Sequence, residues 1–283
     1  MKLSAHHKFV GDDVEWYEPT SSYDVVYGSK VFDFTMPMVA VSNSERVIVG
    51  GCAIDLENKL PPNVEHVMPD YSIYGTETAY GYLTRGCPRN CSFCNVSQHQ
   101  GFVSERVADL SEFWTGQKEI VLLDPNMYAS KDWKVCSDQL IKAGSAIDFS
   151  QGVDIRVMTP DKVDALNQLN IKIIHFAWDN YEFKTYEKLK RLRREFKFSG
   201  RNMRVYVLTN FNTTHEQDLD RVMKLRDLDY DPYVMIFNKE LAPKVTKRLA
   251  RWVNSKFIWR SVDNFADYGK KIEVVLDGQQ TLF

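Results

Sequence analysis

The stretch EIVLLDPN, residues 119–126, is followed by DWKVCSDQLIKAG, residues 132–144, and this pair decides the fold. The first run is apolar, includes β-branched residues and ends in polar side chains, as a buried strand does. The second run has the apolar spacing of a helix and closes on glycine. A strand followed at once by a helix is the unit from which parallel sheets are built, because parallel strands need a crossover between them.

The same alternation extends on both sides of this unit. Strands are predicted at 79–86, 119–126, 147–157, 172–179, 204–210 and 233–238. Helices are predicted at 132–144, 159–170, 186–196, 215–228 and 242–254. Thr159 and Pro160 are typical of a helix start, as cap residue and first-turn proline. These units predict an α/β fold with a parallel sheet, either open and doubly wound or curved like a barrel.

Residues 1–75 predict a small α/β domain in front of this sheet. A short helix is expected over Lys2–Phe9, and strands are expected at 23–29 and 46–51. The proline-rich, polar stretch 60–75 marks a boundary, so that residues 76–283 form the second domain.

The composition narrows the class of protein. The chain has 283 residues, 44% of them hydrophobic, which is enough for a sizeable core. The 36 lysines and arginines nearly balance the 38 acidic residues, so the net charge of −2 gives no general reason to expect a polyanionic partner. No apolar run predicts a membrane span or a secretory signal. The five cysteines are odd in number and clustered, which favours metal binding in a reducing cytoplasm over disulfides.

The cluster lies in RGCPRNCSFCNV, residues 85–96, directly after the first strand of the predicted sheet. It contains Cys87, Cys91 and Cys94 with the spacing C-x3-C-x2-C. Zinc would need a fourth ligand, which His99 could supply. Three thiolates on one loop are better matched to a [4Fe–4S] cluster whose fourth iron keeps an open coordination position.

Polar side chains follow the other strands, at the edge where parallel sheets bind ligands. They are Asp124, Asn126, Gln151, Asp154, Arg156, His175, Asp179 and Asn210. Along the predicted strand 147–157, Gln151, Asp154 and Arg156 are expected to share one face. Alternation also puts His175 and Asp179 on one face, with Phe176 and Trp178 turned toward the helices as core. The plainer interpretations are an ion pair between Asp154 and Arg156, and a satisfied core histidine at His175.

The cysteine spacing, with Phe93 before the last cysteine and a β/α run after it, resembles the radical S-adenosylmethionine (radical SAM) enzymes. The resemblance implies a partial (β/α)6 barrel of the TIM type and a [4Fe–4S] cluster held by Cys87, Cys91 and Cys94. In that family the open iron binds the amino and carboxylate groups of S-adenosylmethionine. One electron then cleaves the sulfonium, and the resulting 5′-deoxyadenosyl radical removes a hydrogen atom from the substrate.

The resemblance also implies roles for the polar residues at the strand ends. Phe93 matches the aromatic residue whose neighbourhood contacts adenine. Asp124-Pro125-Asn126 stands where the family often has Gly-Gly-Glu, and it would offer a carboxylate to the methionine ammonium. Arg156 suits the methionine carboxylate. The expected cofactor-binding set is completed by Gln151, Asp154 and Asn210, and the expected catalytic pair that contacts substrate or ribose is His175 and Asp179.

The N-terminal part resembles the Rossmann-like cobalamin-binding domain of one radical SAM subgroup. It lacks the Asp-x-His-x-x-Gly loop that would ligate cobalt, so we expect a reduced, cofactor-free domain. A cobalamin-type radical methylase, a nucleic-acid-modifying radical enzyme and a Cys3His zinc-binding module remain alternatives. A methylthiotransferase is disfavoured because it needs three more cysteines, and Cys52 and Cys136 are expected to be small buried residues instead.

Three features bear on partners. The resemblance implies a low-potential electron donor such as flavodoxin or ferredoxin. Residues 184–204 hold nine lysines and arginines, which predict a solvated helix face or, alternatively, a surface that contacts a nucleic-acid substrate. The C-terminal QQTLF, residues 279–283, resembles the short peptide that binds the replication sliding clamp, which would give a weak contact with that protein.

Overall fold

The structure is a computed structural model that describes residues 1–32, 40–57 and 59–269. Six parallel strands form the main sheet, in the order β10-β9-β8-β7-β6-β3. They are β3 (Ala79–Gly81), β6 (Glu119–Leu122), β7 (Ala146–Phe149), β8 (Asn170–Ala177), β9 (Met203–Thr209) and β10 (Asp231–Ile236). Each later strand is added on the same side of the one before, and the predicted α/β fold with a parallel sheet is confirmed.

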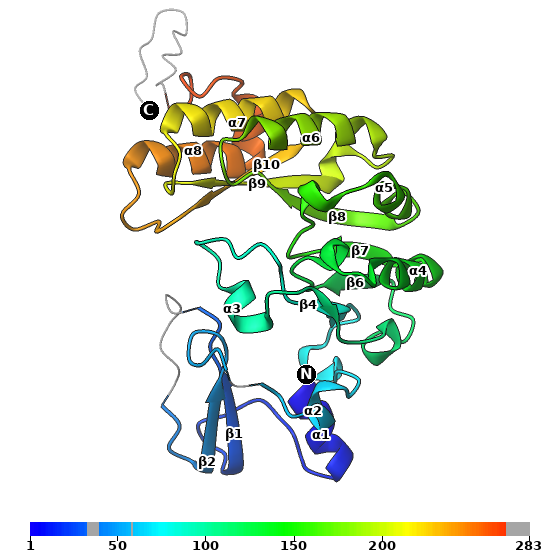
Figure 1. Ribbon diagram of the computed structural model, residues 1–283. Helices are drawn as coiled ribbons and strands as arrows, with labels where there is room; N and C mark the ends of the chain where they lie inside the picture. The colour runs from blue at the N-terminus through cyan, green and yellow to red at the C-terminus, as the bar shows by residue number, and fades with distance from the viewer. Residues whose placement is uncertain (33–39, 58, 270–283) are drawn as a thin grey trace, which may run out of the picture.

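Helices flank one face of this sheet (Figure 1). They are α4 (Trp133–Ala143), α5 (Pro160–Leu166), α6 (Phe183–Glu195), α7 (His215–Asp227) and α8 (Lys244–Asn254), followed by the short α9 (Lys256–Ser261). The first five lie where the sequence predicts helices. Thr159 is the N-cap of α5 and Pro160 its first residue, as predicted, although the Thr159 side chain makes no capping hydrogen bond.

Alternation along the strands separates two faces. The residues turned toward the helices belong to one buried cluster, which includes Ile120, Leu122, Ile147, Phe149, Ile174, Phe176, Val205, Val207 and Val234. Phe176 is 1% exposed and Trp178 is 2% exposed, so the prediction that both belong to the core is confirmed. The other face carries polar and aromatic residues, because successive side chains on a strand point in opposite directions.

The first predicted strand, 79–86, is broken in two. Strand β3 ends at Gly81, where an added Cβ would come within 2.3 Å of the Phe113 ring. The next residues form β4 (Thr84–Arg85), which pairs antiparallel with β5 (Glu105–Arg106) in a separate two-stranded sheet. The chain therefore leaves the main sheet just before the cysteine loop.

The third predicted strand, 147–157, is also too long. Strand β7 ends at Phe149, and Gly152 turns the chain with a φ of +102° against the backbone of β8. Residues Ile155–Val157 then form a single 3₁₀ turn, η4. The prediction that Gln151, Asp154 and Arg156 share the face of one strand is therefore wrong, because a glycine-dependent turn intervenes.

The N-terminal part contains α1 (Lys2–Val10) and a two-stranded parallel sheet of β1 (Tyr23–Ser29) and β2 (Ser44–Gly50). The stretch 60–75 includes α2 (Pro62–Glu65) and the 3₁₀ turn η1 (Ser72–Tyr74). The Tyr71 hydroxyl donates a hydrogen bond of 2.6 Å to the carbonyl oxygen of Phe113. This stretch is thus packed against the part of the chain that leads into β6.

No helix among the described residues is long and apolar enough to cross a membrane. The basic segment 184–204 is largely helix α6, on which Lys184, Arg191 and Arg194 are exposed. The predicted clamp-binding peptide, residues 279–283, lies outside the described residues.

Arg221 on α7 ties the ends of two strands together. Its side chain is fully buried and forms an ion pair of 2.6 Å with Asp218. It also donates to the carbonyl oxygens of Asp179 (2.9 Å) and Leu208 (2.7 Å), which belong to the ends of β8 and β9. A buried cation is tolerated only when it is paired and hydrogen-bonded in this way.

We expect Arg221→Met to lower the free energy of unfolding by about 3 kcal/mol or more, because it removes the cation paired with the buried Asp218 and leaves three carbonyl groups without this donor. Urea denaturation followed by circular dichroism measures the change. Arg194→Met on the exposed face of α6 is the matched control and should change stability by no more than about 0.5 kcal/mol. Equal effects of the two substitutions would contradict this role for Arg221.

Candidate functional site

The three cysteines lie on one loop between β4 and β5, on the opposite side of the sheet from α4 to α8 (Figure 1). The loop starts at Gly86, whose φ is +87° and where an added Cβ would come within 2.0 Å of the Val103 carbonyl oxygen. The backbone of Cys87 donates to the carbonyl oxygen of Gly101 (3.0 Å). Helix α3 (Val96–Gln100) lies within the loop. These contacts close the loop at its base.

All three thiols are free and partly exposed. Cys91 lies close enough to Cys87 and Cys94 for their charges to raise its pKa, and burial is the larger cause of that rise. Among the described residues, no group of three His, Cys, Asp or Glu side chains is arranged to hold a metal ion. The donor set suits a thiolate-ligated cluster, whereas the side chains as placed do not converge on one point.

Asp124 anchors the chain just before this loop. Its carboxylate accepts hydrogen bonds from the backbone of Leu83 (3.0 Å), and from the backbone and hydroxyl of Thr84 (2.7 Å for the hydroxyl). The side chain is 3% exposed, and burial raises its pKa to about 6 against the opposing effect of these bonds. The carboxylate predicted to bind an ammonium is therefore already occupied by the protein backbone.

Asn126, two residues further on, faces the cysteine loop. Its Nδ2 lies 3.5 Å from the Cys87 sulfur and donates to it. Its Oδ1 is buried and has no hydrogen-bond partner among the described residues. A buried amide oxygen without a partner is costly unless a ligand satisfies it, which makes Asn126 a better candidate for ligand binding than Asp124.

Arg89 connects the cysteine loop to the turn after β7. It donates to Asp154, which also accepts from the Nε of Arg156 (2.7 Å). Burial tends to raise the pKa of Asp154, but Arg156 and Arg89 outweigh it and lower the pKa. The structure contains the ion pair between Asp154 and Arg156 that is the plainer interpretation of these residues, and their role in cofactor binding stays a prediction. Arg156 remains exposed and near Cys91, with donors left for a ligand.

Asp179 lies at the end of β8, near Cys91 and Arg156. Burial raises its pKa to about 6, although Arg156 and Arg221 oppose that rise. The loop and the strand ends therefore bring a thiol, a guanidinium and a carboxyl group together. This is the edge of the sheet where the sequence places the predicted site.

Aromatic rings continue the site toward β10. Phe93 on the cysteine loop makes an edge contact with Phe211 (5.4 Å between ring centres), which makes another with Phe237 (5.0 Å). Asn210, at a φ of +60°, donates to the carbonyl oxygen of Phe237 (2.8 Å). Phe93 and Asn210 thus lie at the predicted edge, and the amide of Asn210 joins the ends of β9 and β10.

His175 lies further from the strand ends than Asp179. Its side chain is on the face of β8 turned away from α4 to α8, which we call the helix-free face. His175 is 6% exposed, hydrogen-bonded to the Phe149 carbonyl oxygen (3.0 Å) and stacked on Tyr206 (5.0 Å). Burial lowers its pKa below the ordinary value of 6.5, so the ring is neutral at pH 7. The protein itself supplies the hydrogen-bond and stacking partners of this ring, and a catalytic role for His175 stays a prediction.

Other predicted residues lie away from this group. Gln151 is exposed in the turn after β7. The Nδ1 of His99 bonds to the carbonyl oxygen of Leu56 (2.7 Å) in the N-terminal part. Cys136 is fully buried, as predicted, whereas Cys52 is only half-buried, so the prediction for Cys52 is wrong.

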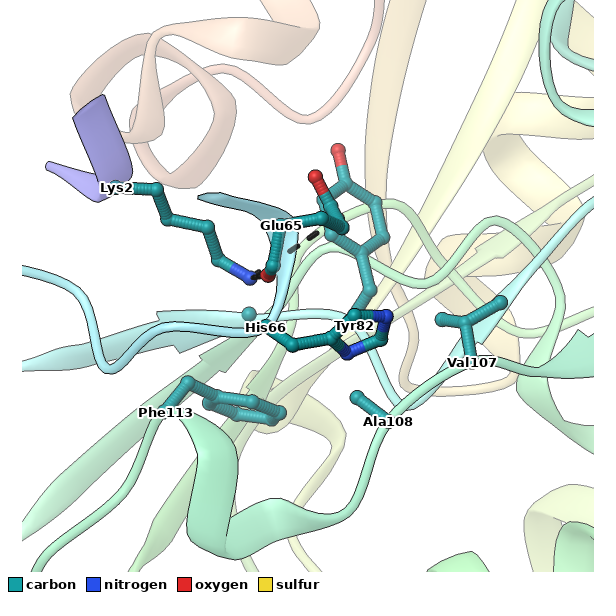
Figure 2. Close-up of a pocket in the computed structure, with 8 residues that line it drawn as sticks. Lys2, Glu65, His66, Tyr82, Val107, Ala108 and Phe113 are labelled. Carbon is teal, nitrogen blue, oxygen red and sulfur yellow. Dashed lines mark hydrogen bonds and ion pairs between the residues drawn. The ribbon is translucent and has the colours of Figure 1, made fainter. Parts of the chain in front are cut away.

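A separate pocket lies between α1, α2 and β3 (Figure 2). Figure 2 shows Lys2 and Glu65 turned toward one another, with Tyr82 behind them. Arg85 pairs with the same glutamate (2.7 Å) and lies over the Tyr82 ring (4.2 Å). The charged groups that line this pocket are paired with one another. The pocket therefore connects the N-terminal part to the sheet and has few free polar groups for a ligand.

Sequence reasoning missed Arg89, Phe211 and Arg221. An arginine in the apolar stripe of a helix was a signal for Arg221, because only a paired cation is tolerated there. Arg89 and Phe211 lie in loops, where no periodicity marks which side chains face the site.

We compared the chain with known protein families and with curated proteins. No family model matches the chain, and no curated protein matches it.

The buried Asp124 makes stability depend on pH. Its pKa of about 6 in the folded chain exceeds its ordinary value of 3.8, so the folded state binds the proton more tightly than the unfolded state. This contribution to stability is present below about pH 4, is lost as the pH rises through about 6, and amounts to about 3 kcal/mol.

Denaturant titrations of the wild type and Asp124→Asn across this range isolate the contribution, because asparagine does not titrate. The difference in stability between the two proteins should shift in favour of the variant as the pH rises. Parallel pH profiles for the two proteins would show that Asp124 is not protonated in the folded state near pH 5.

Proposed function

We propose that this protein is a radical SAM enzyme that binds one [4Fe–4S] cluster through Cys87, Cys91 and Cys94. The observation that carries the proposal is the position of the C-x3-C-x2-C loop. It follows the first strand of a parallel sheet, with the charges of Arg156 and Asp179 close enough to affect the pKa of Cys91. The six-stranded sheet with helices on one face has the strand count and order of the partial (β/α)6 barrel that the resemblance implies.

The residues around the loop fit such a cluster in three respects. The thiols are free, they are partly exposed, and they lie on a loop closed at its base. Asn126 supplies an amide donor to the Cys87 sulfur, and hydrogen bonds to sulfur are one way in which proteins tune cluster potentials. When bound, the cluster passes one electron from a low-potential donor such as flavodoxin or ferredoxin to S-adenosylmethionine.

With the cluster bound, this electron would serve to cleave the sulfonium, so that S-adenosylmethionine and one hydrogen atom of the substrate would yield methionine and 5′-deoxyadenosine. The chain contributes binding and orientation to these steps. Arg156 provides donors for the methionine carboxylate. The free Oδ1 of Asn126 would accept from the methionine ammonium, and the ring pair Phe93–Phe211 offers an aromatic surface for adenine.

Two other classes make different predictions. A Cys3His zinc module would require the Nε2 of His99 as its fourth ligand, since the Nδ1 is hydrogen-bonded to Leu56, and it would give a colourless protein. A cobalamin-dependent methylase would need a histidine for cobalt in the N-terminal part. Both ring nitrogens of His7 are engaged there, by Asp12 and Tyr27. Neither class accounts for the residues gathered beside Cys91.

Anaerobic reconstitution with iron and sulfide tests the proposal. We expect a brown protein with about four irons per chain that forms 5′-deoxyadenosine from S-adenosylmethionine once dithionite is added. Cys91→Ala should lose both the colour and the product. Cys52→Ala is the matched control, because Cys52 lies outside the loop, and it should keep both.

A colourless protein that retains about one zinc after the same treatment would overturn the proposal in favour of the zinc module. A brown protein that forms no 5′-deoxyadenosine would retain the cluster and exclude the radical reaction.

Arg156→Gln tests the binding of S-adenosylmethionine. Loss of a charged donor to a carboxylate should raise the KM for S-adenosylmethionine about tenfold or more and leave the iron content unchanged. Arg201→Gln, which alters an exposed arginine after α6, is the control. If Arg156 only pairs with Asp154, the variant will be less stable and its KM will not change.

A further inference from the structure

The helix-free face of the sheet carries a row of rings from β8 to β10. The rings of His175 and Tyr206 are stacked (5.0 Å, 10° between planes), and Tyr206 makes an edge contact with Tyr233 (5.8 Å). Strand register places Ala177, Tyr206 and Tyr233 side by side. Both tyrosine rings are only partly buried, and Met235 beyond them is 46% exposed.

Hydrogen-bonding groups lie along the same face. The Oδ1 of Asp148 is buried and has no partner among the described residues. Arg204 uses its Nε for Asp231 (3.1 Å) and lies near the Tyr233 ring, which leaves terminal donors of its guanidinium for a ligand. The face therefore offers ring surface, an acceptor and a cationic donor together.

This face is continuous with the proposed site. Asp179 lies two residues beyond Ala177, the last residue of β8, and the intervening Trp178 still donates a backbone hydrogen bond to Tyr206 of β9 (2.8 Å). Two residues span at most about 7 Å. Ala177 has a small side chain, so nothing bulky on β8 separates the rings from Asp179. A flat molecule on the rings would lie within reach of a reactive group held at the strand ends.

The segment that carries β9, β10 and the helices packed behind them is more basic than the rest of the chain. Residues 184–260 hold 19 lysines and arginines against nine acidic residues, although the whole chain has a net charge of −2. Helix α8 has no acidic residue, exposes Lys244, Lys247 and Arg251, and packs on the edge strand β10. A polyanion could therefore pass from α8 around this edge onto the rings.

We propose that the helix-free face between β7 and β10 binds a single-stranded nucleic acid and holds one nucleotide against Tyr206 and Tyr233. Every base has a π-face that can stack on an aromatic side chain, and the partly exposed rings of Tyr206 and Tyr233 offer such a surface. The N–H groups of a base satisfy Asp148, and a phosphate suits Arg204. The exposed lysines and arginine of α8 contact the backbone phosphates. This inference deepens the proposed function, on which it rests for the reaction, by naming the substrate class.

Binding can be measured apart from the reaction. Reconstituted full-length protein without reductant, first free of S-adenosylmethionine and then saturated with it, is titrated into labelled single strands of DNA and RNA of about 12 nucleotides. Fluorescence anisotropy gives the Kd. Tyr206→Ala and Tyr233→Ala should each weaken binding about tenfold, and Tyr206→Phe should bind like the wild type because it keeps the ring. Tyr181→Ala, at an exposed tyrosine before α6, is the matched control.

Salt dependence tests the role of α8. For single strands the slope of log K against log salt is about 0.7 in magnitude for each phosphate that the protein neutralises. Lys244→Gln, Lys247→Gln and Arg251→Gln together should therefore reduce the slope by about 2. The same three-fold neutralisation at Lys131, Lys134 and Lys142, which are exposed around α4, should leave the slope unchanged.

Four results would overturn the inference. In the first, neither strand binds, and in the second, the folded Tyr206→Ala and Tyr233→Ala variants bind as tightly as the wild type. In the third, a mononucleotide binds as tightly as a strand, and in the fourth, added S-adenosylmethionine displaces the strand. The last would assign the rings to the adenine of the cofactor. Formation of 5′-deoxyadenosine, assayed separately, keeps the two proposals distinct, because it depends on the cluster and not on the rings.

Discussion

The contact between Asp124 and the backbone of residues 83–84 is the constraint on which the site depends. It holds the chain at the point where it leaves the main sheet, one strand before the cysteines. Without an acceptor there, two buried N–H groups would be left unpaired, which a folded protein rarely tolerates. The cysteine loop is therefore fixed relative to β6, and Asn126 is carried to the Cys87 sulfur by the same short segment.

A second constraint fixes the far side of the site. Arg221 is buried beneath the ends of β8 and β9, where its guanidinium bonds to their carbonyl groups and to Asp218. Arg89 and Phe93 then reach from the cysteine loop across to Asp154 and Phe211. The loop is thus held at its base by hydrogen bonds and across the strand ends by a charge pair and a ring contact.

The division of the sheet into two faces connects these local contacts to function. One face is filled by aliphatic and aromatic residues against the helices, and this burial holds the sheet together. The opposite face can carry polar groups and partly exposed rings because, among the described residues, the helices α4 to α8 do not pack there (Figure 1). Asp148, Arg204 and Tyr206 would each be poorly suited to the buried face, since they bring polar atoms that require partners.

The sequence by itself determined the alternation of strands and helices, the parallel sheet and the cysteine loop that follows its first strand, because periodicity and spacing are local properties of the chain. Only the tertiary structure decided that β3 and β7 end early, where Gly81 meets Phe113 and Gly152 meets β8. It also decided that Asp124 bonds to the backbone, that Asn126 is left with a free oxygen, and that Arg89 and Arg221 belong to the site. These outcomes depend on contacts between residues far apart in the chain, which no local pattern encodes.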